Sequence, residues 1–435
     1  MNSLNFENIY LENRWQQNQK VDFDDTGVIT NITPTTTPNE SRNTIDGYAI
    51  PSFINSHSHS FQYAMAGLAE CVSPKARNDD FWTWRNQMYE LALSVTPERL
   101  EEITTNLYKR MRANGYTHVI EFHYLHHSQD GSSYPAIAEL SNRIIQASLN
   151  AKIDLTIVPV LYQFGNFNTP ASSEQRRFIF REHENYLRLL DELTKNIGDL
   201  PSVKLGAGIH SLRAAIGKQV SDVFNYNASL PFHIHIAEQT KEVSDCQANF
   251  GKHPIDLLSE FIEFNERVNL VHATHIEQTH VQKISKSGST VVLCPTTEAN
   301  LGDGIFPLID YLNANGSFSI GSDSHIGLSP LEELRWLDYA QRLIHRKRNL
   351  LLADNNIGYS DSGTLLFDTC QRGGRRSAGL FGSEAFSVGQ PLNAIVLDSA
   401  SPLFADKPAE KAISTLIYGG DTSNIGKLLY RGKFD

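Results

Sequence analysis

The chain has 435 residues, and its 38 lysines and arginines against 49 aspartates and glutamates give a formal net charge of −11 at pH 7. This acidic balance argues against a nucleic-acid-binding protein, which needs clustered basic residues. Hydrophobic residues make up 40% of the chain, as in a soluble globular protein, and no apolar run approaches the ~18 residues of a membrane span.

The cysteines and the first residues point to a reducing compartment. Cys71, Cys246, Cys294 and Cys370 lie far apart and form no CxxC pair, so neither a cysteine zinc knuckle nor a redox motif is expected. Residues 1–10 carry Asn and Glu where a secretory signal has an apolar run. We therefore expect a cytoplasmic protein that contacts neither nucleic acid nor membrane.

Eight apolar, β-type runs alternate with helix-compatible stretches through the middle of the chain. The runs are residues 48–54, 117–122, 155–160, 203–209, 231–236, 268–271, 290–294 and 317–321. Such alternation predicts parallel strands joined by helical crossovers, and eight strands close a (β/α)8 TIM-type barrel. An open doubly wound sheet is the alternative fold.

Two of the expected helices carry clear end signals. Thr96-Pro97-Glu98 combines an N-cap residue, a proline at the first helical position and an acidic first turn, and Gly115 follows as a stop. Residues 277–286 before Gly288 form a second helical segment.

The two ends of the chain read differently from the middle. Residues 8–14, 20–25 and 28–32 near the start, and 394–398, 415–418 and 427–431 near the end, are short strand-like pieces separated by turn residues. We predict a small composite β domain built from residues 1–49 and 386–435, with the barrel in residues 50–385.

Histidines mark the catalytic face of the predicted barrel, because eleven of the sixteen lie at or just beyond the carboxyl ends of predicted strands. His57 and His59 close the first strand, and residues two apart point to the same face. His233 and His235 repeat the pattern on the fifth strand. His272 ends the sixth strand and Asp323 the eighth.

Each of these residues alone is equally consistent with a polar side chain at a strand end. Together they offer nitrogen and carboxylate ligands suited to zinc or another divalent first-row metal.

This arrangement, with its split β domain, resembles the amidohydrolase superfamily. Seven blocks narrow the resemblance to the formimidoylglutamate deiminases, which hydrolyse N-formimino-L-glutamate to N-formyl-L-glutamate and ammonia in histidine degradation. The blocks are residues 57–62, 65–70, 81–85, 121–124, 210–213, 233–239 and 297–304.

The resemblance implies one Zn²⁺ held by four residues, and a homodimer. The implied ligands are His57, His59, His235 and Asp323. A bridging lysine for a second metal is lacking, since the fourth strand ends in His210 and Lys204 lies near its start.

The resemblance also implies the catalytic groups. Glu238 would take a proton from the attacking water and pass it to the leaving nitrogen, His272 would orient or protonate the intermediate, and Asp323 would act as both ligand and proton acceptor. For Glu238 the alternative is a first-turn acid of the next helix.

A substrate with two carboxylates needs local cations in a chain of net charge −11. Arg85 and Arg213 can make bidentate carboxylate contacts, and the resemblance implies that role for both. It adds Gln62, Tyr124 and His210 as hydrogen-bond partners. For Arg85 the alternative is a cation on a helix surface.

Two other functions stay open at this point. One is a related deaminase acting on another amidine, a guanidine or a heteroaromatic ring, although a neutral ring needs no pair of arginine clamps. The other is a non-catalytic barrel that serves in binding.

Overall fold

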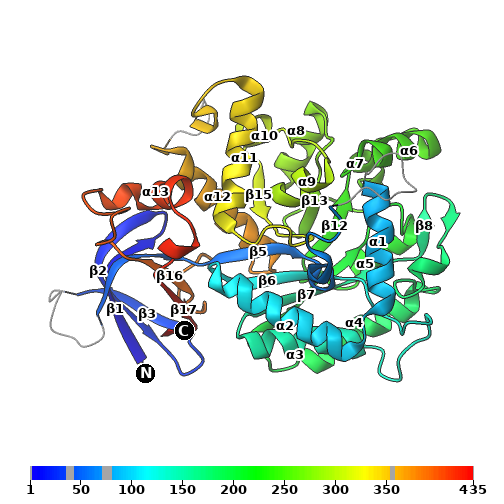
Figure 1. Cartoon of the computed structure of the whole chain (residues 1–435), viewed down its shortest axis with the longest axis horizontal. Coiled ribbons are helices and arrows are strands. Elements are labelled where there is room, and N and C mark those ends of the chain that lie inside the picture. Colours follow the sequence, from blue (N-terminus) through cyan, green and yellow to red (C-terminus); the bar gives the residue numbers. More distant parts are fainter. Residues whose placement is uncertain (1, 36–43, 71–80, 353–357, 435) are drawn as a thin grey trace.

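The computed structural model describes residues 2–35, 44–70, 81–352 and 358–434. Cys71 lies outside these ranges, whereas the three other cysteines are buried and free. Two large sheets organise the chain, a parallel one with its helices and a smaller mixed one that contains both ends (Figure 1).

The parallel sheet confirms the predicted TIM-like barrel. Its strands pair in chain order from first to last. They are β5 (Phe53–Ser58), β6 (Tyr116–His123), β7 (Asp154–Leu161), β10 (Val203–Leu205) with β11 (Ala207–Ile209), β12 (Phe232–Ile236), β13 (Val268–His272), β14 (Thr290–Leu293) and β15 (Ser317–Ile320).

The barrel closes between its first and last strands, β5 and β15. Ser58 and Asp323 form a parallel bridge just beyond the end of β15. The His57 carbonyl accepts hydrogen bonds from the backbone N–H groups of Ser322 and Asp323 at 3.1 and 3.0 Å, and the Asp323 carbonyl accepts one from His59 at 3.1 Å. This closing seam therefore places His57, His59 and Asp323 side by side.

The structure corrects the bounds of two barrel strands. The run 48–54 is divided at Ser52, because β4 (Thr44–Pro51) belongs to the mixed sheet and only β5 enters the barrel. The fourth strand is interrupted at Gly206, where a Cβ would lie 2.8 Å from a Val158 methyl.

The helices cover the outside of the barrel (Figure 1). They are α1 (Phe81–Ser94), α2 (Pro97–Ala113), α3 (Glu139–Ala151), α4 (His183–Ile197), α5 (Lys218–Asn225), α6 (Thr240–Phe250), α7 (Pro254–Leu258), α8 (Gln278–Ser287), α9 (Pro295–Leu301), α10 (Leu308–Asn313), α11 (Pro330–His345) and α12 (Ser362–Ser377). The two helices whose ends the sequence predicts are α2 and α8. The Thr96 side chain caps α2, and α8 ends before Gly288, which has a φ of 78°. Within the described residues, no helix has both the length and the apolar character needed to cross a membrane.

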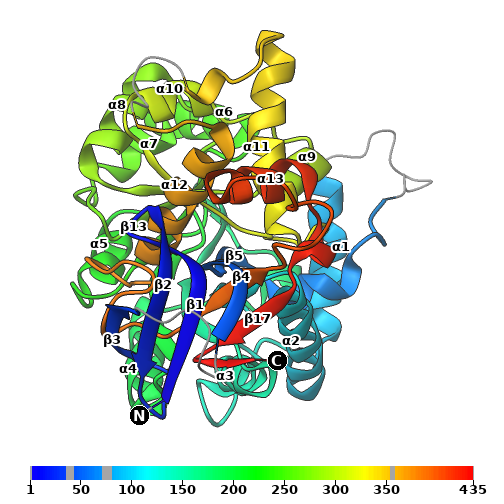
Figure 2. The same ribbon diagram turned by 90° about the vertical axis from the view of Figure 1, so that its left-hand side faces the viewer.

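The mixed sheet takes strands from both ends of the chain, as Figure 2 shows. Its order is β18-β17-β16-β4-β1-β2-β3, with β1 (Asn2–Leu11), β2 (Arg14–Phe23), β3 (Ile29–Pro34), β16 (Ala394–Leu397), β17 (Lys427–Tyr430) and β18 (Lys433–Phe434). The domain boundaries at 49/50 and 385/386 stay a prediction.

The expected strand at 415–418 is wrong. Residues 412–419 form the helix α13 (Ala412–Gly419), which packs on α11 and α12. Its buried residues Ala412, Ile413, Leu416 and Ile417 follow a helical period, so tertiary packing overrides the local β propensity.

We predict that Gly321→Ala damages the closing seam. A Cβ at position 321 would lie 2.6 Å from His57 Cβ and 2.9 Å from the His57 backbone N and O atoms. Since the nearest atoms belong to the backbone and to Cβ, the strands must separate, at a cost of about 1–3 kcal/mol. Urea unfolding and bound-metal analysis measure the effect.

The matched control is Gly419→Ala in α13, where the nearest atom is a Leu403 methyl at 3.3 Å. We expect this variant to keep the stability of the parent protein. Equal stability of both variants would show that the seam tolerates a side chain.

Candidate metal centre and active site

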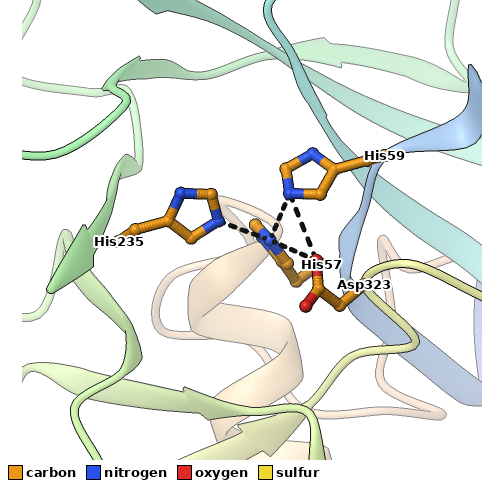
Figure 3. Close-up of side chains that lie close together, drawn as sticks. All are labelled: His57, His59, His235 and Asp323. Carbon is orange, nitrogen blue, oxygen red and sulfur yellow. Dashed lines mark hydrogen bonds and ion pairs between the residues drawn. The ribbon is translucent and has the colours of Figure 1, made fainter. Parts of the chain in front are cut away.

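Three histidines and one aspartate converge at the carboxyl end of the barrel (Figure 3). His57 Nε2 lies 3.0 Å from His59 Nε2 and 2.9 Å from His235 Nε2. Asp323 Oδ1 lies 3.4 Å from His57 Nε2 and 3.2 Å from His59 Nε2. All four residues are buried, and they are the ones that the sequence brought forward as ligands.

The donor set fits a tetrahedral divalent metal. Ligands about 2.0–2.1 Å from zinc lie about 3.3 Å from one another, close to the spacing of these four atoms. His59 Nδ1 lies 2.9 Å from the Phe122 carbonyl, which can accept its proton and leave the Nε2 lone pair for a metal. Three imidazole nitrogens this close repel one another unless a cation or shared proton lies among them.

Burial and hydrogen bonding hold His57, His235 and Asp323 in the protonation states that metal ligands require. Burial lowers the pKa of His57 to about 3, with a further contribution from His59, and lowers the pKa of His235 well below its ordinary value. Burial alone would raise the pKa of Asp323, but hydrogen bonds from His57 and His59 hold it well below the usual range. His57 and His235 therefore offer neutral imidazoles, and Asp323 a carboxylate, at neutral pH.

A buried carboxylate fixes the chain on both sides of His59. Glu121 on β6 accepts hydrogen bonds from Ser58 Oγ at 2.5 Å, the Ser60 backbone N–H at 2.6 Å and Tyr108 Oη at 3.0 Å. Glu121 lies in one of the resembling blocks, but no local pattern predicts this contact, because its partners come from other elements of the fold.

His233 does not join the metal group. Its Nε2 lies 3.0 Å from the Ser377 carbonyl at the end of α12. The expectation that a second HxH pair supports a metal is therefore wrong for His233, which packs in the barrel interior, and holds only for His235 at the rim.

Several residues at the site have left-handed backbone conformations. Ala237, His272, Ala273, Asp323 and His325 have φ values of 50°, 68°, 49°, 48° and 66°. Non-glycine residues adopt this conformation at an energetic cost, and such residues concentrate at functional sites. Here the left-handed residues lie at or just beyond the ends of β12, β13 and β15, and two of them, His272 and Asp323, line the cavity beside the metal group.

His272 is flanked by three carboxylates. Its Nδ1 lies 3.2 Å from Glu298 Oε1, and its Nε2 lies 3.7 Å from Glu238 and 3.9 Å from Asp323. Burial lowers the pKa of His272, but Glu238 and the hydrogen bond to Glu298 outweigh this and raise it to about 10. Burial raises the pKa of Glu238. The cluster thus pairs an imidazolium with a carboxyl that holds a proton more readily than usual.

Glu298 is a residue that the sequence did not bring forward. It lies in α9, within the resembling block 297–304, and its Oε1 also accepts the Cys294 backbone N–H at 2.9 Å. Cys294 itself groups with His272 and Asp323 within 4.8 Å. Burial raises the pKa of its thiol well above the ordinary value, which disfavours the thiolate that binds metals.

A cavity opens beside the metal group. Its lining includes every predicted catalytic and substrate residue: Gln62, Arg85, Tyr124, His210, Arg213, Glu238, His272 and Asp323. Of the predicted ligands, His59 and His235 also face it. Residues scattered through the sequence thus form one site.

The two arginines have unused hydrogen-bonding capacity in this cavity. Both Nε atoms are buried without a hydrogen-bond partner in the described structure. The Arg85 guanidinium stacks 4.4 Å from the Trp82 ring centroid, which excludes the interpretation as a simple surface cation. Arg213 lies 3.9 Å from Glu238 and is 5% exposed.

The predicted hydrogen-bond partners line the same wall. Gln62 Nε2 donates to Tyr124 Oη at 2.7 Å, and Gln62 Oε1 is buried without a partner among the described residues. The His210 ring packs 5.6 Å from that of Tyr124, and burial lowers the pKa of His210 well below its ordinary value. Lys204 lies exposed in β10, away from this wall.

Known proteins resemble the whole chain. The model of the amidohydrolase family matches residues 48–419. Formimidoylglutamate deiminase from Pseudomonas aeruginosa is 41% identical over 437 residues, covering 100% of this chain and 94% of that protein.

The crystal structure of an amidohydrolase from Brucella melitensis has 35% sequence identity and a TM-score of 0.92, covering 100% and 94% of the two chains. Guanine deaminase from C. acetobutylicum, with 18% identity, a TM-score of 0.77 and 100% of both chains covered, shares the fold.

We predict that His235→Gln abolishes tight metal binding whereas His233→Gln retains it. The two histidines share β12, but only His235 reaches the metal group. In chelator-treated parent protein, added Zn²⁺ should raise the melting temperature. A free Zn²⁺ concentration of 1,000 times Kd corresponds to about 4 kcal/mol of added stability.

Metal analysis of each variant and a thermal melt with and without Zn²⁺ measure this difference. Loss of metal from both variants, or from neither, would contradict the assignment of His235 as the ligand.

Proposed function

The chain belongs to the amidohydrolase family, and from that membership we propose that it hydrolyses N-formimino-L-glutamate to N-formyl-L-glutamate and ammonia. The observation that carries this proposal is the cavity that places two arginines with buried, unpaired Nε atoms beside a His/His/His/Asp group. The full-length likeness to the Pseudomonas enzyme supports the same substrate.

One zinc ion, or another divalent first-row metal, would be held by the four residues of Figure 3. When bound, such a metal lowers the pKa of a coordinated water to about 7 and so makes a nucleophile available at neutral pH. The chain contributes the neutral imidazoles, the carboxylate and the buried surroundings.

Proton transfer falls to Glu238 and His272. The Glu238 carboxylate faces the cavity beside the metal group, and its raised pKa suits a group that accepts a proton from the attacking water and then gives it to the leaving nitrogen. His272, held by Glu298, presents its Nε2 toward Glu238 and Asp323. From that position it donates a hydrogen bond to the developing intermediate, and Asp323 accepts a proton as well as serving as a ligand.

Substrate binding falls to the cations and hydrogen-bond donors of the same cavity. Arg85 and Arg213 pair with the two carboxylates. Gln62, Tyr124 and His210 complete the contacts on the adjoining wall. The local positive charge compensates for the chain's net charge of −11.

A deaminase of neutral heteroaromatic rings is less compatible with this cavity. The buried Arg213 and the half-buried Arg85 both have unpaired Nε atoms, and a neutral ring would not offset the desolvation cost of these two charges. The homodimer and the cytoplasmic location remain predictions from the sequence and its resemblance.

Ammonia release from N-formimino-L-glutamate by zinc-loaded protein is the direct test. We expect turnover that disappears after chelation and returns with added Zn²⁺. Turnover of a guanine- or adenine-type compound, without any of the formimino compound, would refute the proposal.

We predict that Arg213→Met lowers kcat/KM by about a hundredfold or more while zinc content stays unchanged. Truncating one partner of a buried charge pair costs about 2–5 kcal/mol. The control is Lys241→Met, which removes a half-exposed cation 5.8 Å from the same Trp82 ring and should change kcat/KM less than twofold. Loss of zinc from the Arg213 variant would instead assign that arginine a structural role.

A further inference from the structure

Two tyrosines on the cavity wall, Tyr89 on α1 and Tyr162 after β7, have no role in the chemistry described so far. Their hydroxyl groups meet at one buried amide, the side chain of Gln175. Gln175 Nε2 donates to Tyr162 Oη at 2.7 Å and to Tyr89 Oη at 3.1 Å. The amide thus supplies one hydrogen to each phenol oxygen.

The orientation of this amide is fixed from the other side. Gln175 Oε1 accepts the Ser172 backbone N–H at 2.9 Å. A flipped amide would place its NH₂ group against that N–H and its carbonyl oxygen against the phenols. The Gln175 NH₂ group therefore faces the tyrosines, and both phenol oxygens act as acceptors toward it.

Tyr89 and Tyr162 lie close to each other. Burial, together with the charge of Tyr162 and hydrogen bonding to it, raises the pKa of Tyr89. Because Gln175 Nε2 donates to both phenol oxygens, each hydroxyl hydrogen is left to donate to the other phenol or into the cavity. The Tyr162 hydrogen can therefore reach a ligand in the cavity that Tyr162 lines.

The Tyr162 ring is held so that this hydrogen serves the cavity. The ring lies 4.6 Å from the His210 ring and 5.7 Å from the Phe178 ring, and the residue is 4% exposed. Although burial lowers the pKa of Arg213, the carboxylates of Glu242 and Glu238 and the phenols of Tyr162 and Tyr89 raise it, so both phenols lie near that guanidinium.

We propose that Tyr162 is a substrate-binding residue whose hydroxyl donates to the substrate carboxylate held by Arg213, and that it makes the enzyme selective for formimino compounds with two carboxylates. This inference rests on the proposed function. A hydroxyl whose oxygen already accepts a hydrogen bond from Gln175 can offer its hydrogen to an acceptor, and a carboxylate is only an acceptor. The hydrogen bond is stronger when the acceptor is charged, so the wall favours a carboxylate at this position.

The test compares Tyr162→Phe with the parent enzyme on three substrates. They are N-formimino-L-glutamate, N-formimino-4-aminobutyrate, which lacks the α-carboxylate, and N-formimino-L-norvaline, in which a methyl group replaces the side-chain carboxylate. We expect KM for the first to rise about ten- to hundredfold, as for a lost hydrogen bond to a charged group, with kcat within threefold. One of the two monocarboxylates lacks the carboxylate that Tyr162 would contact. For that compound, KM of the variant and KM of the parent should agree within twofold.

Two control variants separate hydrogen-bond donation from packing. Tyr89→Phe leaves the Tyr162 hydrogen in place and should raise KM less than threefold. Gln175→Leu removes the amide that donates to Tyr162 and should raise KM by an intermediate factor. This variant tests the proposal if Tyr162→Phe fails to fold. Equal losses on all three substrates, no loss in Tyr162→Phe, or an equal loss in Tyr89→Phe would overturn the inference.

Calorimetry with N-formyl-L-glutamate and the zinc-loaded proteins keeps the two proposals distinguishable. We expect Tyr162→Phe to weaken its binding about ten- to hundredfold. If the parent protein releases no ammonia but binding weakens in this way, the proposed reaction is wrong and the anion-binding role of Tyr162 stands. Unchanged binding would overturn the role of Tyr162 even in an active enzyme.

Discussion

The backbone pairing that closes the barrel is the constraint on which the active site depends. β5 and β15 lie at opposite ends of the parallel sheet, and backbone hydrogen bonds among residues 57–59 and 322–323 join them. The same few residues carry three of the four candidate ligands. Barrel closure and the assembly of the metal group are therefore one event, and Gly321 allows it because its missing side chain lets the strands approach.

Electrostatics then divide one buried cluster into different chemical roles. The three ligand histidines are surrounded by one another and by apolar barrel walls, and for His57 and His235 burial disfavours the charged form. His272 is equally buried, but Glu238, Glu298 and Asp323 surround it and favour its protonated form. Similar side chains at the ends of neighbouring strands thus become metal ligands or a hydrogen-bond donor according to the carboxylates nearby.

The cavity combines two kinds of polar group that the surrounding fold leaves unsatisfied. Arg85 and Arg213 have buried Nε atoms without partners in the described structure, and Gln62 has an unpaired carbonyl oxygen. Buried polar groups are normally paired within a protein. These exceptions gather around one hollow next to the metal group, as expected where the partner is a ligand.

Period and spacing in the sequence determined the barrel, because alternating apolar runs and helices admit few other architectures. They also brought forward candidate ligands, since all strand ends of a parallel barrel meet at one rim. The family resemblance then narrowed these candidates to His57, His59, His235 and Asp323. Local patterns failed where tertiary contacts decide the outcome. The segment 415–418 became helical against α11 and α12, and His233 turned to a carbonyl at the end of α12. Glu121, Glu298 and Gln175 act through partners between 3 and 86 residues away in the chain, and only the folded chain brings those partners within hydrogen-bonding distance.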